Sequence, residues 1–304
     1  MSSQEGSKRA IIAAFLANLG IALSKFLVFL LTGAASLLAE AIHSTADTGN
    51  QGLLMLGAKQ ARKPADDEHP FGYANRRYFW SFIVALVLFS LGGLFAIFEG
   101  IEKLRDPHEL DHVGLAIGML LFAIVLESWS FRTAYMESKK IRGEQSTFTF
   151  IRRSRSPEIP VVLLEDTGAL IGLGIALFGV AMAAITDEPR WDAAGSLAIG
   201  ILLVVIAIFL ANEMASLLLG EAATHEDIAK IRGAIDSHPC VVRIIHLRTE
   251  HIGPEDIMLA TKVEFDHGMT IEQLADEIDA VEARVRAAVP ITRLIFIEPD
   301  VYRA

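Results

Sequence analysis

The stretch SLLAEAIHSTADTGNQ, residues 36–51, decides the fold class of this chain. It lies in an apolar run long enough to cross a membrane, yet it carries Glu40, His43 and Asp47. On a helix that turns by about 100° per residue, these three side chains fall within a sector of roughly 60°, and Asn50 and Gln51 lie beside that sector. The stretch is therefore predicted to form a membrane-spanning helix with one polar stripe.

A second apolar run, residues 160–185, carries the adjacent acids Glu165 and Asp166. Ionisable groups in hydrocarbon are costly, so a functional role is the default hypothesis for them. A single carboxylate could instead be a protonated, hydrogen-bonded contact between two helices. For His43, Asp47 and Asp166 together, on two helices, that explanation is much weaker.

Composition extends this interpretation to most of the chain. The 304 residues are 52% hydrophobic, and their mean hydropathy is +0.42. The apolar excess lies in stretches of roughly 20 residues or more, enough for a helix to cross about 30 Å of hydrocarbon. We predict six spans, at residues 9–32, 36–57, 79–100, 113–133, 160–185 and 191–220.

The basic residues predict the orientation. If the N-terminus is cytoplasmic, the outer connections contain only Lys103, Arg105 and Arg190, and the inner ones contain most other Lys and Arg residues. This bias follows the positive-inside rule and places both termini in the cytoplasm. The net charge of −10 comes from acids in the tail and loops, and it indicates no nucleic-acid partner. Because no organelle-targeting segment precedes the first span, we expect a bacterial inner membrane.

From residue 221 onward the composition is that of a soluble domain. Residues 225–238 and 270–289 have helical spacing, whereas residues 241–249, 257–265 and 294–297 are typical of strands. The order α-β-β-α-β predicts a small ferredoxin-like α+β domain. We therefore expect a transmembrane domain at residues 1–220 and a cytoplasmic domain at residues 221–304.

The polar groups of the second span have the types that a divalent metal ion requires. His43 and Asp47, at positions i and i+4, can offer nitrogen and oxygen to one ion in a roughly tetrahedral shell. Two ligands on one helix do not complete a site, and Asp166 lies at a comparable depth in the fifth span. Because these ligands bind metal only when deprotonated, metal binding and protonation compete. We predict a proton-coupled metal transporter that works by alternating access.

Two other classes of protein were weighed. An intramembrane metal hydrolase would need a general base beside an open metal position, and no span contains an HExxH motif. A membrane-anchored sensor, in which the tail is the working part, would leave the acids within the spans unexplained. We therefore expect a secondary transporter rather than an enzyme.

These features together resemble those of a known family. The segment SLLAEAIHSTADTGNQ, the DDEHPFGY loop, the acid-bearing fifth span and the α+β tail are similar to those of the cation diffusion facilitator family of zinc transporters. The segment LLEDTGALIGLGIAL resembles the zinc transporter 9-like branch in particular. The resemblance implies a homodimer that exchanges Zn²⁺ for protons and exports the metal from the cytoplasm. Zn²⁺ would be cargo, with no prosthetic group.

The family's intramembrane site has four ligands on the second and fifth helices. His43, Asp47 and Asp166 match three of them, but Val162 stands where the family usually has His or Asp. The fourth ligand is therefore open between Glu165, Glu40 and water. A site with one nitrogen is less selective for zinc, so Mn²⁺, Fe²⁺ and Co²⁺ also remain candidates.

Two further metal sites of the family are matched only in part. In the loop, Asp66 and His69 have the expected spacing, but Tyr73 replaces a histidine, so we predict a weak or absent site. In the tail, His246 alone matches, and the other ligand positions hold Ala260, Ala275, Phe296 and Glu298. We predict no binuclear cluster in the tail, which would then serve dimerisation.

Four residues received other interpretations. Glu127, in the fourth span, is expected either to line the transport route or to pair with Arg132. Lys25, in the first span, is expected to make packing and snorkelling contacts. His251 and His267 are predicted to be solvated loop residues.

Overall fold

The computed structural model describes residues 3–32, 35–107 and 113–303. The chain divides into two compact units. The first comprises Met1–Gln60 and Arg76–Ala215, and the second comprises Ala61–Asn75 and Ser216–Ala304. The second unit thus contains a loop from between two helices of the first, as well as the C-terminal tail.

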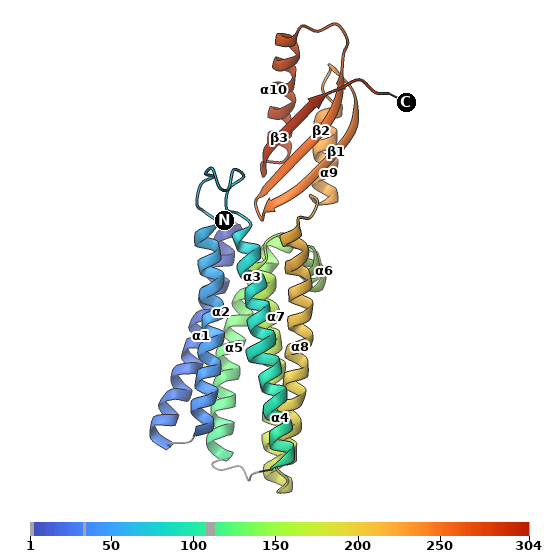
Figure 1. Ribbon diagram of the computed structural model, residues 1–304. Coiled ribbons are helices and arrows are strands. Elements are labelled where there is room, and N and C mark those ends of the chain that lie inside the picture. Colours follow the sequence, from blue (N-terminus) through green and yellow to red (C-terminus); the bar gives the residue numbers. More distant parts are fainter. Residues whose placement is uncertain (1–2, 33–34, 108–112, 304) are drawn as a thin grey trace. The chain divides into compact units, whose positions relative to one another are not determined.

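The first unit is a bundle of long helices that run alongside one another (Figure 1). Its elements are α1 (Ser3–Thr32), α2 (Ala35–Gln60), α3 (Arg76–Val87), the π-helical segment η1 (Leu88–Leu94), α4 (Phe95–Arg105), α5 (Val113–Arg142), α6 (Thr147–Arg153), α7 (Glu158–Thr186) and α8 (Arg190–Leu219). α1 contacts α2, α5 and α7, and α5 contacts α7. These four helices carry the polar residues of the spans.

The predicted helical membrane architecture is confirmed. Five segments of the described chain are long and apolar enough to cross a membrane: Glu5–Val28, Arg76–Arg105, Val113–Arg142, Glu158–Thr186 and Arg190–Leu219. The remaining predicted span, the second at residues 36–57, coincides with α2, and the side chains of residues 35–43 lie outside the described part. Within these helices the backbone forms its own hydrogen bonds, which hydrocarbon requires.

The helices α4 and α8 pack closely against each other at two glycines. A Cβ atom on Gly200 of α8 would lie 2.6 Å from the backbone nitrogen of Ile97, and one on Gly100 of α4 would lie 2.7 Å from that of Leu197. Both distances are shorter than any real Cβ contact. The third and sixth spans therefore approach each other at backbone distance, as small residues permit in membranes.

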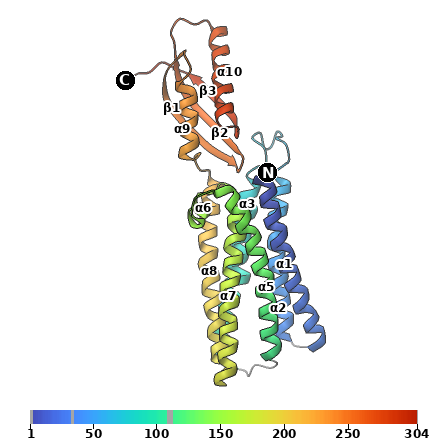
Figure 2. The ribbon, with the colours of Figure 1, turned by 180° about the vertical axis from the view of Figure 1, so that it is seen from behind.

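The tail has the predicted α-β-β-α-β order. α9 (His225–Asp236) precedes β1 (Val241–Gly253) and β2 (Asp256–Phe265), and α10 (Ile271–Ala288) precedes β3 (Thr292–Pro299). The sheet order is β1-β2-β3. β1 and β2 are antiparallel, and β2 and β3 are parallel. The two helices contact each other, α9 contacts β1, and α10 contacts β3 (Figure 2).

The core of the tail forms where the predicted apolar stripes meet. Ile231 and Ile235 of α9 and Val281 and Val285 of α10 are fully buried, together with Ile257, Leu259 and Val263 of β2. Thr270 and Gln273 form a reciprocal capping box at the start of α10, which fixes where that helix begins.

The prediction for His251 was wrong. This residue lies in β1 and is only 2% exposed, with Nδ1 3.2 Å from the carbonyl oxygen of Gly253. The strand continues to Gly253, four residues beyond the end we predicted, because it pairs with β2 down to the Gly253–Asp256 turn. His267, by contrast, follows β2 and is exposed, as expected.

Candidate metal centre

Three carboxyl groups are buried in the middle of the helical unit. The exposed fractions are 5% for Glu127 of α5, 8% for Glu165 of α7 and 1% for Asp166 of α7. Asp47 of α2 is half-buried. Because buried acids are expensive in hydrocarbon, their partners decide what each can do.

Asp166 connects α7 to α5. The hydroxyl of Ser130 donates a hydrogen bond to Asp166 Oδ2 over 2.6 Å, and Ser130 is fully buried. Asp166 also lies within electrostatic range of Glu127 and Glu165. None of the described residues donates a hydrogen bond to its second carboxylate oxygen, Oδ1, so that oxygen is open to another ligand.

Glu165 connects α7 to α2. Gln51 donates to its Oε2 over 2.8 Å and Asn50 to its Oε1 over 3.3 Å. Both amides belong to the polar side of α2 that sequence analysis identified. The side of α2 with Asn50 and Gln51 thus contacts Glu165 of α7.

Glu127 is the buried acid of α5 whose role the sequence left open. It lies within electrostatic range of Glu165, Asp47 and Lys25. Ser130, which binds Asp166, is three residues further along α5 and therefore on the same helix face. Arg132 is five residues away, about 140° around the helix. These positions place Glu127 beside the acids of α2 and α7 and on a different side of α5 from Arg132.

A sequence signal for Glu127 does exist in the fourth span. The buried residues of α5 recur at helical spacing and are mostly small or polar: Ala123, Glu127, Ser130, Ala134, Glu137 and Ser138. Such a face is typical of helix contacts inside a membrane protein. It shows that Glu127 points into the bundle, although the stripe alone does not indicate which helix it meets.

Asp47 joins the same group of acids. It lies within electrostatic range of both Glu127 and Glu165. The other two predicted residues of α2, Glu40 and His43, have side chains outside the described part of the structure. The structure therefore brings Asp47, Glu165 and Asp166 together with Glu127, and His43 and Glu40 stay predictions.

Lys25 of α1 is directed toward the same region. Its ammonium donates a hydrogen bond to Ser44 Oγ of α2 over 3.0 Å, and it lies within electrostatic range of Glu127. Lys25 thus makes a packing contact with α2, as expected, and its ammonium turns to that helix instead of snorkelling. Lys25 supplies a positive charge beside the acids.

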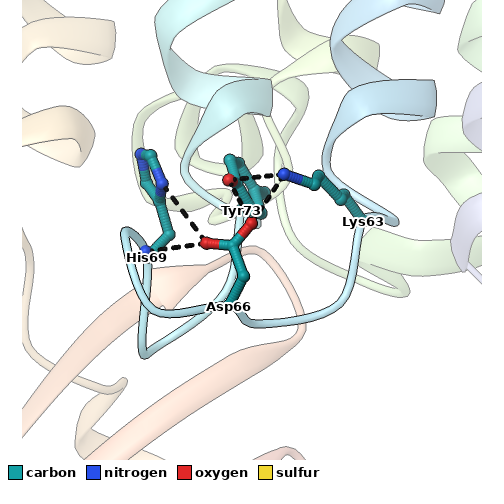
Figure 3. Close-up of polar contacts among 4 residues, drawn as sticks. All are labelled: Lys63, Asp66, His69 and Tyr73. Carbon is teal, nitrogen blue, oxygen red and sulfur yellow. Dashed lines mark hydrogen bonds and ion pairs between the residues drawn. The ribbon is translucent and has the colours of Figure 1, made fainter.

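The loop residues Asp66 and His69 are held in a small polar network (Figure 3). Asp66 Oδ2 accepts hydrogen bonds from the Lys63 ammonium over 2.6 Å and from the Tyr73 hydroxyl over 2.7 Å. Its Oδ1 accepts one from the backbone N–H of His69 over 2.9 Å. The imidazole of His69 stacks on the Tyr73 ring, with 4.2 Å between ring centroids.

This network explains the state of the Asp66 carboxylate. Hydrogen bonds from Lys63 and then from Tyr73 hold the pKa of Asp66 well below its ordinary value of 3.8. The same contacts raise the pKa of Lys63. The carboxylate is therefore ionised and already neutralised by an ammonium group, so a metal ion would have to displace Lys63.

The chain belongs to the cation efflux family. The family's transmembrane domain matches residues 11–219, and the cytoplasmic domain of cation efflux proteins matches residues 223–301.

Similar proteins include the mitochondrial proton-coupled zinc antiporter SLC30A9 from Mus musculus. It is 33% identical over 244 residues, which is 80% of this chain and 43% of that protein. The chain thus spans less than half the length of this relative. Magnetosome protein MamB from Magnetospirillum gryphiswaldense is 26% identical over 289 residues, 94% of this chain and 92% of MamB.

Among solved structures, a nickel form of a MamM C-terminal domain variant is similar to the tail. It is 24% identical, covers 26% of this chain and 100% of that domain, and gives a TM-score of 0.25.

Proposed function

We propose that this chain exchanges a divalent metal cation, with Zn²⁺ as the first candidate, for protons across a membrane. The carrying observation is the group of acids that α2, α5 and α7 bring together inside the helical unit. The names of the SLC30A9 relatives, proton-coupled zinc antiporters, support Zn²⁺ and proton coupling. Mn²⁺, Fe²⁺ and Co²⁺ are the alternative cargoes.

The chemistry follows from the charges. Several carboxylates at close range in a medium of low dielectric repel one another strongly. Either a dication or protons relieve that repulsion, and metal ligands must lose their protons to bind. Opening the site alternately to each side of the membrane would then exchange metal for protons.

We propose His43, Asp47 and Asp166 as metal ligands and Glu127 as the fourth. Glu165 is a poorer candidate because the amides of Asn50 and Gln51 already engage both of its oxygens. Glu127 is buried and accepts no hydrogen bond from any residue of the described ranges. A buried, unpaired carboxylate is costly, and a bound cation would offset that cost. Glu40 is the alternative candidate for the fourth ligand.

We further propose a transmembrane domain at residues 1–220 and a cytoplasmic domain at residues 221–304, with both termini in the cytoplasm. The family matches at residues 11–219 and 223–301 support this division. The proposed location is a bacterial cell membrane, and the near-complete alignment with a bacterial MamB supports a bacterial source. Export from the cytoplasm and homodimerisation through the tail complete the proposal, and the loop at Asp66 and His69 is proposed to bind metal weakly or not at all.

Metal flux into proteoliposomes tests the proposed function. The vesicles contain a zinc-sensitive dye, and an imposed pH gradient drives exchange. The double variant Asp47→Asn, Asp166→Asn is expected to abolish the gradient-dependent zinc signal. The control is Asp192→Asn. Asp192 lies at the start of α8 and pairs with Lys103 of α4 over 3.2 Å, and its removal should leave transport normal. Undiminished flux in the double variant would contradict the proposal, and wild-type protein without flux would favour a sensor.

A further inference from the structure

A second group of potential ligands lies in the tail domain. His238 and Cys240 belong to the turn between α9 and β1, and Glu277 lies on α10. One ligand atom from each of these residues lies within 4.8 Å of the other two. His238 Nε2 is 3.3 Å from Glu277 Oε2. In the described part of the chain, this is the single group of at least three such residues.

We propose that His238, Cys240 and Glu277 bind one thiophilic divalent cation, such as Zn²⁺ or Cd²⁺, in the tail. The three residues offer sulfur, nitrogen and oxygen, and a thiolate favours these metals over Mg²⁺ and Ca²⁺. The fourth position would be filled by water or by Asp266, whose carboxylate lies within electrostatic range of Cys240.

The geometry suits a tetrahedral ion. For metal–ligand bonds of about 2.0–2.2 Å, the edge of a tetrahedron is roughly 3.3–3.6 Å. The distance of 3.3 Å between His238 Nε2 and Glu277 Oε2 falls in that range. The Cys240 thiol lies beside the Glu277 carboxylate. A metal ion would take the place of that thiol proton, which is released to solvent.

Backbone contacts hold the three residues in place without a metal. The N–H of His238 donates to the carbonyl of Ile235 over 3.0 Å, and the carbonyl of Cys240 accepts from Asp266 N–H over 2.9 Å. Arg284, two turns after Glu277 on α10, donates to the carbonyls of Ala234 and Ser237 at the end of α9. α10 is thereby fixed against the turn that carries His238 and Cys240.

A purely structural role explains the site less well. His238 is 8% exposed, and its Nδ1 is buried without a hydrogen-bond partner among the described residues. A structural His–Glu pair would normally satisfy both ring nitrogens, because a buried polar atom without a partner costs about 1–3 kcal/mol. Nε2, which lies 3.3 Å from Glu277 Oε2, is the nitrogen that would bind the ion.

This site is separate from the positions expected for a tail cluster. Those positions are His246, Ala260, Ala275, Phe296 and Glu298, and none of them belongs to the new group. It is also separate from the cargo ligands, so it does not depend on the proposed transport route. A bound ion would connect the α9–β1 turn to α10 and stabilise the tail.

Cadmium titration of the full-length protein in detergent tests the proposal. Cys240 is the only cysteine of the chain, so a thiolate-to-cadmium charge-transfer band in the ultraviolet reports on this residue alone. We expect the band to saturate at one Cd²⁺ per Cys240 and Zn²⁺ to abolish it by competition. Glu277→Gln should weaken the affinity about tenfold or more. The control Asp276→Asn, which removes the neighbouring exposed acid of α10, should leave it unchanged.

Three results would overturn the proposal. They are the absence of a band, saturation at one Cd²⁺ per two chains, and a Cd²⁺ affinity of Glu277→Gln and His238→Gln that equals that of the wild-type protein. The last would indicate a thiol that binds cadmium alone. Thermal unfolding of each variant shows whether it is folded. The Asp47→Asn, Asp166→Asn protein should keep the band, so failure here and failure of the transport proposal are distinguishable.

Discussion

Two buried carboxylates of the helical unit, Glu165 and Glu127, differ in their surroundings. Glu165 accepts hydrogen bonds from two amides of α2, which makes it a structural contact between helices. Glu127 has acids and Lys25 as neighbours and accepts no hydrogen bond within the described ranges. The first carboxylate is satisfied by the protein, and the second is suited to a cation.

The contrast predicts opposite effects of two conservative variants. Glu127→Gln should weaken zinc binding about tenfold or more and leave the unfolding temperature unchanged or higher, because it removes a buried charge. Glu165→Gln should change zinc affinity little but destabilise the protein by about 1–3 kcal/mol, because one amide donor loses its acceptor. Zinc titration and thermal unfolding in detergent measure both. The reverse pattern would identify Glu165 as the ligand.

Part of this residue-scale arrangement could be predicted from the sequence. Helical spacing placed Asp47 beside Asn50 and Gln51, and the burial cost of Glu165 and Asp166 marked the partner helix. Glu127 could not be assigned, because its neighbours come from three other helices and spacing within one helix does not identify them. His251 was missed because the end of a strand depends on its partner, here β2.

At the scale of elements, the loop between α2 and α3 has a defined conformation built on Asp66. Lys63 and Tyr73 occupy one carboxylate oxygen, and the His69 backbone occupies the other. The rings of His69 and Tyr73 are stacked, so a side chain at position 73 lies close enough to bind the same metal ion as His69. We therefore expect the side chains at positions 63 and 73, rather than the backbone conformation of the loop, to limit metal binding here.

Replacing those two side chains should create metal binding in the loop. The double variant Tyr73→His, Lys63→Ala supplies a second imidazole and removes the competing ammonium. We expect it to bind one more Zn²⁺ per chain than the control Lys63→Ala, by isothermal titration. Identical zinc stoichiometry in the two proteins would show that the loop cannot adopt the required geometry.

The contact between α4 and α8 predicts a second pair of variants. Gly200→Ala places a methyl group 2.6 Å from the backbone nitrogen of Ile97, and overpacking of this kind costs about 1–3 kcal/mol. The control Gly174→Ala, on α7, meets no atom within 4 Å and should be neutral or slightly stabilising. Thermal unfolding in detergent compares them. Equal unfolding temperatures would mean that the two helices are not in such close contact.

At the scale of the whole molecule, the boundary between the two units lies close to the change in composition near residue 221. The length of the apolar runs predicts the membrane spans, and period-2 alternation predicts the strands of the tail. The helix and strand order was therefore predictable. The assignment of Ala61–Asn75 to the second unit was not, because a short polar loop carries no signal of the unit it joins.

Zinc located by anomalous scattering in crystals of the full-length protein tests the central claim most directly. The account predicts a peak in the helical unit about 2.0–2.2 Å from carboxylate oxygens of Asp47 and Asp166. A second peak at Cys240 would belong to the separate tail site. Zinc bound elsewhere in the crystal with no peak between Asp47 and Asp166, or these side chains directed toward lipid, would contradict the account.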